Sequence, residues 1–287
     1  MSHSPPLPVP SRRRRGPRKP AIKGLPATPV REFRQLLADA LDDRDDQGRK
    51  WADARWGCYA FYDYDGEPIY VGQTNEQLRV RVQRHLTNQR TDAVAMRILD
   101  IFEVAEMELW PMWDFQGLIK KEVSKAVWVD ALATLNSVEY TAYLKAIEES
   151  RFKAILNEKI PPVSPTTDLP ASRRYPLITP GTRDERGHPD VRIARRAETI
   201  ARLAAVAHER GEVSAGLRRV LVIQAVRLAY VAAVRLAYVE GRPEPDPSVI
   251  DVTGLVGSVL SEFSDPHGPT DQDELSDQVE LEFEDGD

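Results

Sequence analysis

The sequence has a single cysteine, Cys58, among its 287 residues, which excludes a framework of disulfide bonds. No group of cysteine and histidine residues has the spacing of zinc ligands. Long apolar runs without charge are also missing. The most apolar stretch, residues 220–239, carries Arg227 and Arg235, which argues against a membrane-spanning helix. The first residues are rich in proline and arginine, unlike a secretory signal peptide. We therefore expect a cytoplasmic protein that does not contact a membrane.

Charge is distributed unevenly along the chain, which the net charge of -6 conceals. Residues 1–31 carry eight Lys or Arg and no acidic residue, whereas residues 243–287 carry fourteen Asp or Glu and no basic residue. A basic segment without hydrophobic periodicity attracts phosphate groups but has little apolar surface to bury. We expect a disordered basic arm over residues 1–29, which either contacts nucleic acid or only adds solubility. Residues 264–287 are expected to be a disordered acidic tail.

Residues 56–86 combine several local structural signals. Aromatic and small side chains at residues 57–63 predict a strand, and residues 68–72 predict the strand that returns from it. The Asp-Gly pair between them is typical of the tight turn of a β-hairpin. A helix with an apolar stripe is expected to follow, with Thr74 as its N-cap. This segment therefore predicts a hairpin packed against a helix.

Neighbouring segments complete the predicted domain, which extends over residues 30–160. An amphipathic helix is expected at residues 30–41, and the alternation of apolar and acidic residues at 102–110 predicts a third strand. A further helix is expected at residues 136–152. The predicted fold class is α+β, with a small three-stranded antiparallel sheet flanked by helices.

The rest of the chain predicts helices. Residues 161–190 are rich in proline, serine and threonine and are expected to form a linker, followed by an α-helical C-terminal region over residues 191–263. An octapeptide in this region occurs almost unchanged at 225–232 and at 233–240. We expect a helical hairpin that buries its tyrosine and leucine stripe. A homo-oligomer formed through these helices is a further possibility.

Four polar side chains are expected to meet beside the predicted hairpin. Tyr59 and Tyr70 lie on its two strands, close to opposite each other, and can share one face of the sheet. Arg81 and His85 are four residues apart, so they lie on one face of the following helix. Two phenols, a guanidinium and an imidazole would then converge at one edge of the sheet.

These residues resemble the pattern of the GIY-YIG nuclease family. The matching elements, in chain order, are Gly-Cys-Tyr at 57–59, Tyr-Val-Gly at 70–72, Arg81 with His85, Glu139, and Asn157. The resemblance covers roughly residues 55–160 and implies a nuclease domain over residues 30–160. Arg79 is an alternative to Arg81, because the spacing after the second strand admits either residue.

The resemblance implies an endonuclease that hydrolyses phosphodiester bonds in DNA with the help of Mg²⁺ or Mn²⁺. By this resemblance Tyr59 is the candidate base and Tyr70 supports it, while Glu139 holds the metal ion. Arg81 would contact the phosphate and would also lower the pKa of the tyrosine. His85 completes the candidate catalytic set.

Several supporting roles are expected. Gly72 would let the backbone and the substrate approach closely, and Asn157 would be structural, tying a helix to the sheet. Lys120 and Lys121 are expected on a helix beside the site, where they either contact DNA or form a solvated face. Glu139 also fits a purely structural role, as the capping glutamate of a helix that begins near residue 136.

The pattern leaves other functions open. A catalytically silent nucleic-acid-binding protein with the same fold is the main alternative, although binding alone would not require the carboxylate. A partner-binding protein whose acidic tail occupies its own basic groove is another. The sequence does not distinguish restriction, repair and mobility roles, or DNA from RNA as substrate.

Overall fold

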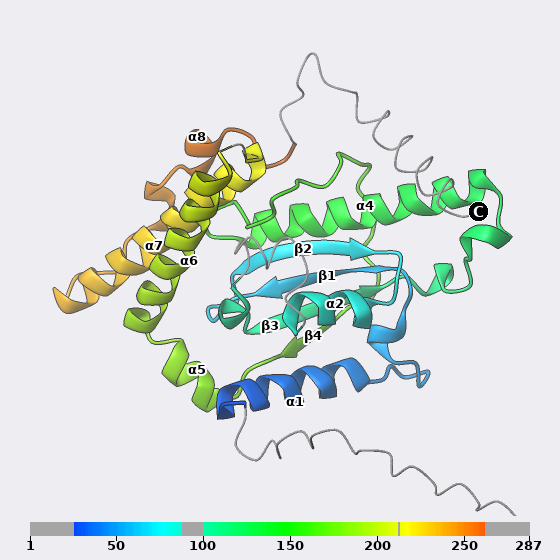
Figure 1. The fold of residues 1–287 in the computed structure, drawn as a ribbon, viewed down its shortest axis with the longest axis horizontal. Helices are drawn as coiled ribbons and strands as arrows, with labels where there is room; N and C mark the ends of the chain where they lie inside the picture. The colour runs from blue at the N-terminus through cyan, green and yellow to red at the C-terminus, as the bar shows by residue number, and fades with distance from the viewer. Residues whose placement is uncertain (1–25, 88–99, 212, 262–287) are drawn as a thin grey trace, which may run out of the picture.

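The computed structural model describes residues 26–87, 100–211 and 213–261, and its centre is an antiparallel sheet. The predicted arm and tail lie almost entirely outside the described residues. Four strands form the sheet in the order β2-β1-β3-β4 (Figure 1). Their bounds are Gly57–Tyr62 for β1, Pro68–Thr74 for β2, Glu106–Pro111 for β3 and Arg173–Pro176 for β4.

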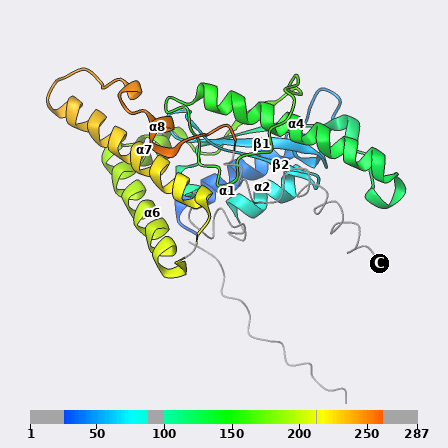
Figure 2. The same ribbon diagram turned by 90° about the horizontal axis from the view of Figure 1, so that it is seen from above.

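Helices cover both faces of the sheet and one of its ends. They are α1 (Thr28–Asp42), α2 (Leu78–Leu86), α4 (Lys125–Glu149), α5 (Pro180–Arg186), α6 (Pro189–Arg210), α7 (Ala215–Val239) and α8 (Val252–Val256). Figure 2 shows α4 on one face of the sheet and α1 with α2 on the other, while α6 and α7 stand together at one end. The α+β class, the antiparallel sheet, the flanking helices and the helical C-terminal region are therefore confirmed.

The predicted number of strands is wrong, because β4 adds a fourth strand within the segment expected to be a linker. Only one residue of β4, Tyr175, is buried, so the strand lacks the apolar alternation that a sequence pattern detects. Antiparallel pairing with β3 and charged side-chain contacts hold it instead. Arg174 donates to Glu106 on β3 at 2.7 Å and lies 3.6 Å from the ring centre of Tyr62. The sheet therefore extends beyond residue 160.

Two helix starts also differ from the predictions. Strand β2 continues through Thr74, whose hydroxyl accepts a hydrogen bond from the Glu76 N–H, and α2 begins only at Leu78. Thr74 is therefore not the N-cap. Helix α4 begins at Lys125 and is capped by Ser124, so Glu139 lies in the middle of the helix. The alternative role of Glu139 as a capping residue is wrong.

The central strand explains the composition of the hairpin. β1 lies between β2 and β3, and all six of its residues are buried. Alternate residues of a strand face opposite sides of the sheet. Tyr59 and Phe61 face α2, where both rings lie against His85. The aromatic and small residues of β1 therefore fit a strand that packs on both sides.

The two octapeptide copies lie along α7 and its C-cap, but only the first has a buried tyrosine. Tyr230 is 6% exposed, whereas Tyr238 in the second copy is 75% exposed. Eight residues turn an α-helix about 80° beyond two full turns, so the copies cannot both face the core. The expectation of a buried stripe therefore holds for the first copy alone. Among the described helices, α7 is also long and apolar enough to cross a membrane by length and composition, and 44% of its most apolar window is buried.

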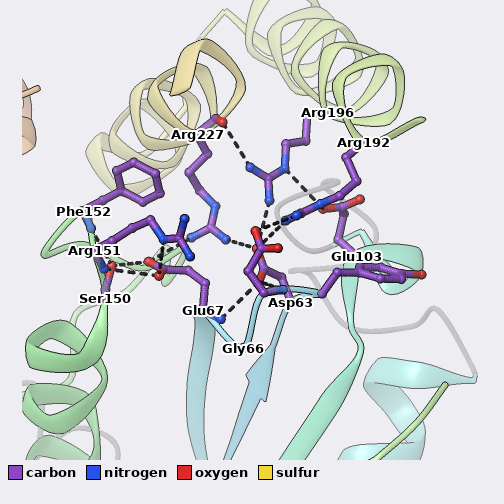
Figure 3. Close-up of polar contacts among 12 residues, drawn as sticks. Asp63, Gly66, Glu67, Glu103, Ser150, Arg151, Phe152, Arg192, Arg196 and Arg227 are labelled. Atoms are coloured by element: carbon purple, nitrogen blue, oxygen red, sulfur yellow. Dashed lines mark hydrogen bonds and ion pairs between the residues drawn. The ribbon is translucent and has the colours of Figure 1, made fainter. Parts of the chain in front are cut away.

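A buried group of ion pairs joins the C-terminal helices to the hairpin (Figure 3). Asp63, directly after β1, is 1% exposed. Its Oδ2 accepts hydrogen bonds from Arg192 and Arg196 on α6 at 2.9 Å and from Arg227 on α7 at 2.8 Å. We call these residues, with Glu67 and Glu103, the Asp63 cluster. Its three guanidinium groups and three carboxyl groups balance in formal charge.

The other oxygen of Asp63 holds the hairpin turn. Oδ1 accepts from the backbone N–H groups of Asp65 and Glu67 at 2.9 and 3.1 Å. Glu67 in turn accepts from the Ser150 hydroxyl at 2.6 Å and from the Arg151 N–H at 3.2 Å, just beyond α4. The tip of the hairpin is therefore fixed from both the C-terminal helices and the end of α4.

Replacing Asp63 by asparagine is expected to lower the free energy of unfolding by about 3–5 kcal/mol, because buried guanidinium groups would lose their counter-charge. Asp65→Asn is the matched control, since Asp65 also pairs with Arg192 at 2.6 Å but its side chain is 43% exposed. It should cost less than about 1 kcal/mol. Chemical denaturation followed by circular dichroism measures both values, and equal losses would contradict a special role for Asp63.

Candidate active site

The two tyrosines of the predicted site share one face of the sheet. Tyr59 lies opposite Gly72 in the register, and Tyr70 lies opposite Phe61. Tyr59 and Tyr70 are therefore diagonal rather than directly opposed, with ring centres 6.2 Å apart in a stacked arrangement. Both phenols face the layer that contains α2.

Helix α2 brings Arg81 and His85 to the tyrosines. The Tyr59 hydroxyl and the Nε2 atom of His85 share a hydrogen bond of 2.8 Å, and the imidazole is 1% exposed. The ring centre of His85 also lies 5.4 Å from that of Tyr70. Arg81 hydrogen-bonds the phenol of Tyr59, while its buried Nε atom has no hydrogen-bond partner among the described residues. Arg81 therefore has a buried donor that is not used within the described residues.

Arg79 has a different role and is not placed with the tyrosines. Its guanidinium donates to Asp53 at 2.9 Å, to the Leu41 carbonyl at 2.6 Å and to Asp42 at 2.9 Å. These contacts hold α2 against the end of α1. Of the two candidate arginines, Arg81 is the one that faces the phenols.

The free edge of β2 is occupied by polar side chains from later in the chain. Asn157 donates to the Val71 carbonyl at 2.8 Å and accepts from the Val71 N–H at 3.0 Å. Two residues on, the backbone amide of Gln73 points the same way and hydrogen-bonds Glu139 on α4. Asn157 thus ties the segment after α4 to the sheet, and Glu139 lies at its edge.

Burial dominates the electrostatics of the acid and base groups. It raises the pKa of Glu139 from 4.5 to about 8, and the charge of Arg81 offsets only part of this shift. Burial, followed by the charge of Arg81, lowers the pKa of His85 from 6.5 to about 4. At neutral pH the carboxyl group is therefore largely protonated, and the imidazole is neutral.

Both phenols also keep their protons. Burial raises the pKa of Tyr59 well above 10, and it raises the pKa of Tyr70 to about 12. Arg81 acts on Tyr59 in the expected direction, because its charge and hydrogen bond lower that pKa. Desolvation nevertheless outweighs it, so Tyr59 is not poised as a base before a substrate enters.

The side chains around Glu139 offer few ligands for a divalent cation. Among the described residues no three His, Cys, Asp or Glu side chains come together as a metal site, so Glu139 is a single candidate ligand. The raised pKa of Glu139 means that Arg81 compensates only part of the cost of burying a carboxylate there, so a further cation would favour the ionised form. Mg²⁺ fits such a site, because it keeps several waters and takes substrate oxygens as further ligands. The residues present are therefore compatible with Mg²⁺ or Mn²⁺ held by Glu139.

The remaining predicted residues divide into two groups. Gly72 belongs to the site, but for a reason that differs from the prediction: a Cβ atom there would lie 2.6 Å from the Tyr59 hydroxyl oxygen. Lys120 and Lys121 lie in a short 3₁₀ helix before α4. This short helix precedes the start of α4 at Lys125, and Glu139 lies about 21 Å further along α4. The structure therefore does not bring the two lysines together with the carboxyl group of Glu139.

Gln73 is a site residue that sequence reasoning missed. It follows the Tyr-Val-Gly element directly, its backbone amide contacts Glu139, and its side chain donates to Asn136 at 2.9 Å. Its side-chain oxygen is buried without a partner among the described residues. The only signal in the sequence that could have indicated Gln73 is its position directly after the Tyr-Val-Gly element at 70–72.

Comparisons with known proteins do not extend this description. A scan against models of protein families, a search of curated proteins and a search of solved structures found no match. The class of protein defined by the structure is thus an α+β protein with a four-stranded antiparallel sheet and a helical C-terminal region.

Gly72→Ala is expected to displace the Tyr59 phenol and break its hydrogen bond with His85, because the added methyl group has no space. Overpacking of this kind costs about 1–3 kcal/mol of stability. Gly117→Ala is the control, since a Cβ atom there meets nothing within 4 Å. Imidazole NMR shifts of His85 should change in the first variant alone, and an unchanged His85 signal in Gly72→Ala would contradict this packing.

Glu139→Gln is expected to alter how stability depends on pH in the absence of metal. The carboxyl group ionises near 4.5 in the unfolded chain and at about 8 in the folded protein. The wild type is therefore relatively most stable below 4.5 and loses up to about 1.4 kcal/mol per pH unit as the pH rises toward 8. The glutamine variant lacks this loss. Denaturation of both proteins in EDTA at pH 5 and pH 8.5 measures the difference, and parallel profiles would disprove the shift.

Proposed function

We propose that this protein is a divalent-metal-dependent DNA endonuclease with a GIY-YIG-type site. The observation that carries the proposal is the position of Arg81. Its guanidinium is close enough to both phenols and to the buried carboxyl group of Glu139 to lower their pKa values, and its Nε atom is buried without a partner among the described residues. A planar cation with an unused donor beside an acidic metal ligand suits a phosphodiester.

The side chains would act on the substrate in distinct ways. Arg81 would bind the scissile phosphate and stabilise the charge that develops on it. The negative phosphate would also offset the charge of Arg81, which is the second cause of the low pKa of His85. His85 would then become a better acceptor for a proton that leaves the attacking water through the Tyr59 hydroxyl. Tyr70 would hold the Tyr59 phenol in place.

Glu139 would hold the divalent ion, which when bound polarises a phosphate oxygen and stabilises the leaving oxygen. Ionisation of Glu139 is required for that role. Its pKa of about 8 means that metal binding and proton release would be linked. Asn157 and Gln73 would keep the edge of β2 in register with the carboxyl group.

The proposal includes DNA as the partner, a cytoplasmic location and no membrane contact. A homo-oligomer formed through the C-terminal helices is part of it as well. The exposed apolar side chains at the end of α7, among them Leu236 at 52% and Val239 at 69%, support that possibility.

One observation favours the alternative of a catalytically silent nucleic-acid-binding protein. Tyr59 is 0% exposed, and its pKa is raised well above 10 because of that burial. A phenol in this state neither meets water nor loses its own proton readily, so it does not become a base. Such a protein would bind DNA through the same surface without cleaving it.

Nicking of supercoiled plasmid DNA, with and without Mg²⁺, is the test of the proposed activity. The wild type should nick only with metal, and Arg81→Ala and Glu139→Ala should each lower the rate by at least about 100-fold. Arg84→Ala is the control, because Arg84 lies on the same helix but pairs with Glu76 at 2.8 Å. It should retain the wild-type rate.

Two results would count against the assignment. Metal-dependent nicking that survives both Arg81→Ala and Glu139→Ala would show that the centre lies elsewhere. Intact DNA binding without nicking by the wild type, at any pH between 6 and 9 and with either Mg²⁺ or Mn²⁺, would favour the silent binder.

A further inference from the structure

The start of α7 lies beside the edge of β2 that carries the candidate site. Glu158 directly follows Asn157, the residue bonded to Val71 on β2. The Glu158 carbonyl accepts a hydrogen bond from Arg219 at 2.7 Å, and its carboxylate accepts one from the Ser214 hydroxyl at 2.7 Å. Ser214 is the N-cap of α7. The first turn of α7 thus contacts Glu158, and the neighbouring residue Asn157 contacts the strand that carries Tyr70.

The contact between α7 and this segment is close. A Cβ atom at Gly216 would lie 2.0 Å from the Glu158 carbonyl oxygen, so the helix backbone rests directly on the chain there. Figures 1 and 2 agree on this placement, with the start of α7 on the β2 side of the sheet, toward the layer of α2. Glu158 is also near enough to contribute to the raised pKa of Tyr70.

A second anchor fixes the orientation of α7. Farther along the helix, Arg227 donates to the buried carboxylate of Asp63 at 2.8 Å, within the Asp63 cluster. Contacts at Ser214 and at Arg227 hold the helix at two points. The first turn of α7 therefore keeps a defined position relative to the hairpin.

Each of the two segments that meet at the contact between Glu158 and α7 carries an exposed cation. Lys159 directly follows Glu158, and Arg218 lies in the first turn of α7. Other arginines of α6 and α7 are paired with acidic groups: Arg192, Arg196 and Arg227 bind Asp63 inside the fold. At the surface, Arg235 binds Asp190 and Arg202 binds Glu198. The acidic neighbour Glu158 is held by Ser214. Positive charge is thus presented to solvent beside the candidate site.

We propose that Lys159 and Arg218 form a docking surface for the phosphate backbone of duplex DNA next to the scissile phosphate. The inference rests on the proposed nuclease function and assigns part of substrate binding to the C-terminal helices. Each DNA strand presents a negative charge about every 3.4 Å along the helix axis, so a duplex seated at Arg81 also passes neighbouring basic side chains. The attachment of α7 at Ser214 and Arg227 fixes the backbone that carries Arg218 before DNA arrives, which reduces the entropy lost on binding.

The experiment compares the double variant Lys159→Ala/Arg218→Ala with the wild type, using a fluorescent 30-base-pair DNA duplex and Ca²⁺ to support binding without turnover. Anisotropy should show roughly tenfold weaker binding at low salt. The slope of log Kd against log salt concentration should fall by about 1.8, the value for two lost phosphate contacts. Both residues are exposed, so stability should be unchanged.

Arg242→Ala is the matched control, because Arg242 is exposed and lies about 35 Å away, past the far end of α7. It should bind DNA as the wild type does. Nicking with Mg²⁺ at saturating protein should proceed at the wild-type rate in the double variant, since both cations lie outside the catalytic group. A slower rate at low protein concentration and a normal rate at saturation would support a docking role.

The outcomes separate this inference from the proposed function. Unchanged affinity and salt slope in the double variant, with a wild type that nicks DNA, overturn the docking surface alone. Weakened binding in the double variant, with a wild type that never nicks, supports the surface and counts against the nuclease. Tighter binding of the wild type to duplex RNA than to DNA, or equal losses in Arg242→Ala, overturn the proposed occupant.

Discussion

The carboxylate of Asp63, surrounded by three guanidinium groups and almost wholly removed from water, is the contact on which the rest of the structure depends. Burial of a charge is strongly unfavourable unless partners compensate it. Here the partners come from two helices far along the chain, and the second oxygen of the same carboxylate orders the hairpin turn. One side chain thus joins the strands that carry the tyrosines to the C-terminal pair.

The same exclusion of water shapes the candidate site. Glu139, Tyr59 and His85 all lie in their uncharged forms near neutral pH. At Glu139 and Tyr59 burial outweighs the positive charge of Arg81, whereas at His85 burial and that charge both lower the pKa. A cation beside Glu139 and an anion beside Arg81 would each reverse part of that balance. Two ligands of opposite charge would therefore change the ionisation states of these groups. A metal ion and a phosphodiester are ligands of this kind.

Much of the fold follows from local sequence patterns. The hairpin, α1, α6 and α7 could be predicted because their apolar periodicity or turn residues are strong. Strand β4 could not, since its pairing depends on contacts such as Arg174 with Glu106, which bridge distant parts of the chain. The prediction of Thr74 as a helix N-cap is wrong because this residue belongs to β2 and pairs within the sheet.

The site could be predicted in part for a related reason. Residue type and order indicated Tyr59, Arg81 and Glu139, and the structure brings them within electrostatic reach of one another. Their ionisation states could not be predicted, because these depend on burial by residues from α2 and α4. The ion pairs between Asp63 and three arginines could not be predicted from the sequence either, since arginine on an amphipathic helix usually faces solvent. The requirement for glycine at position 72 depends on where the Tyr59 phenol lies, which the sequence does not indicate.

The wide sequence separation between Asp63 and Arg227, 164 residues, has a consequence for synthesis on the ribosome. At typical elongation rates, Arg227 emerges on the order of ten seconds or more after the hairpin. During that interval the carboxylate of Asp63, which is buried in the folded protein, does not yet have the guanidinium groups of α6 and α7 as partners. The hairpin that carries the two tyrosines can therefore complete its contacts with α7 only after most of the polypeptide has been synthesised.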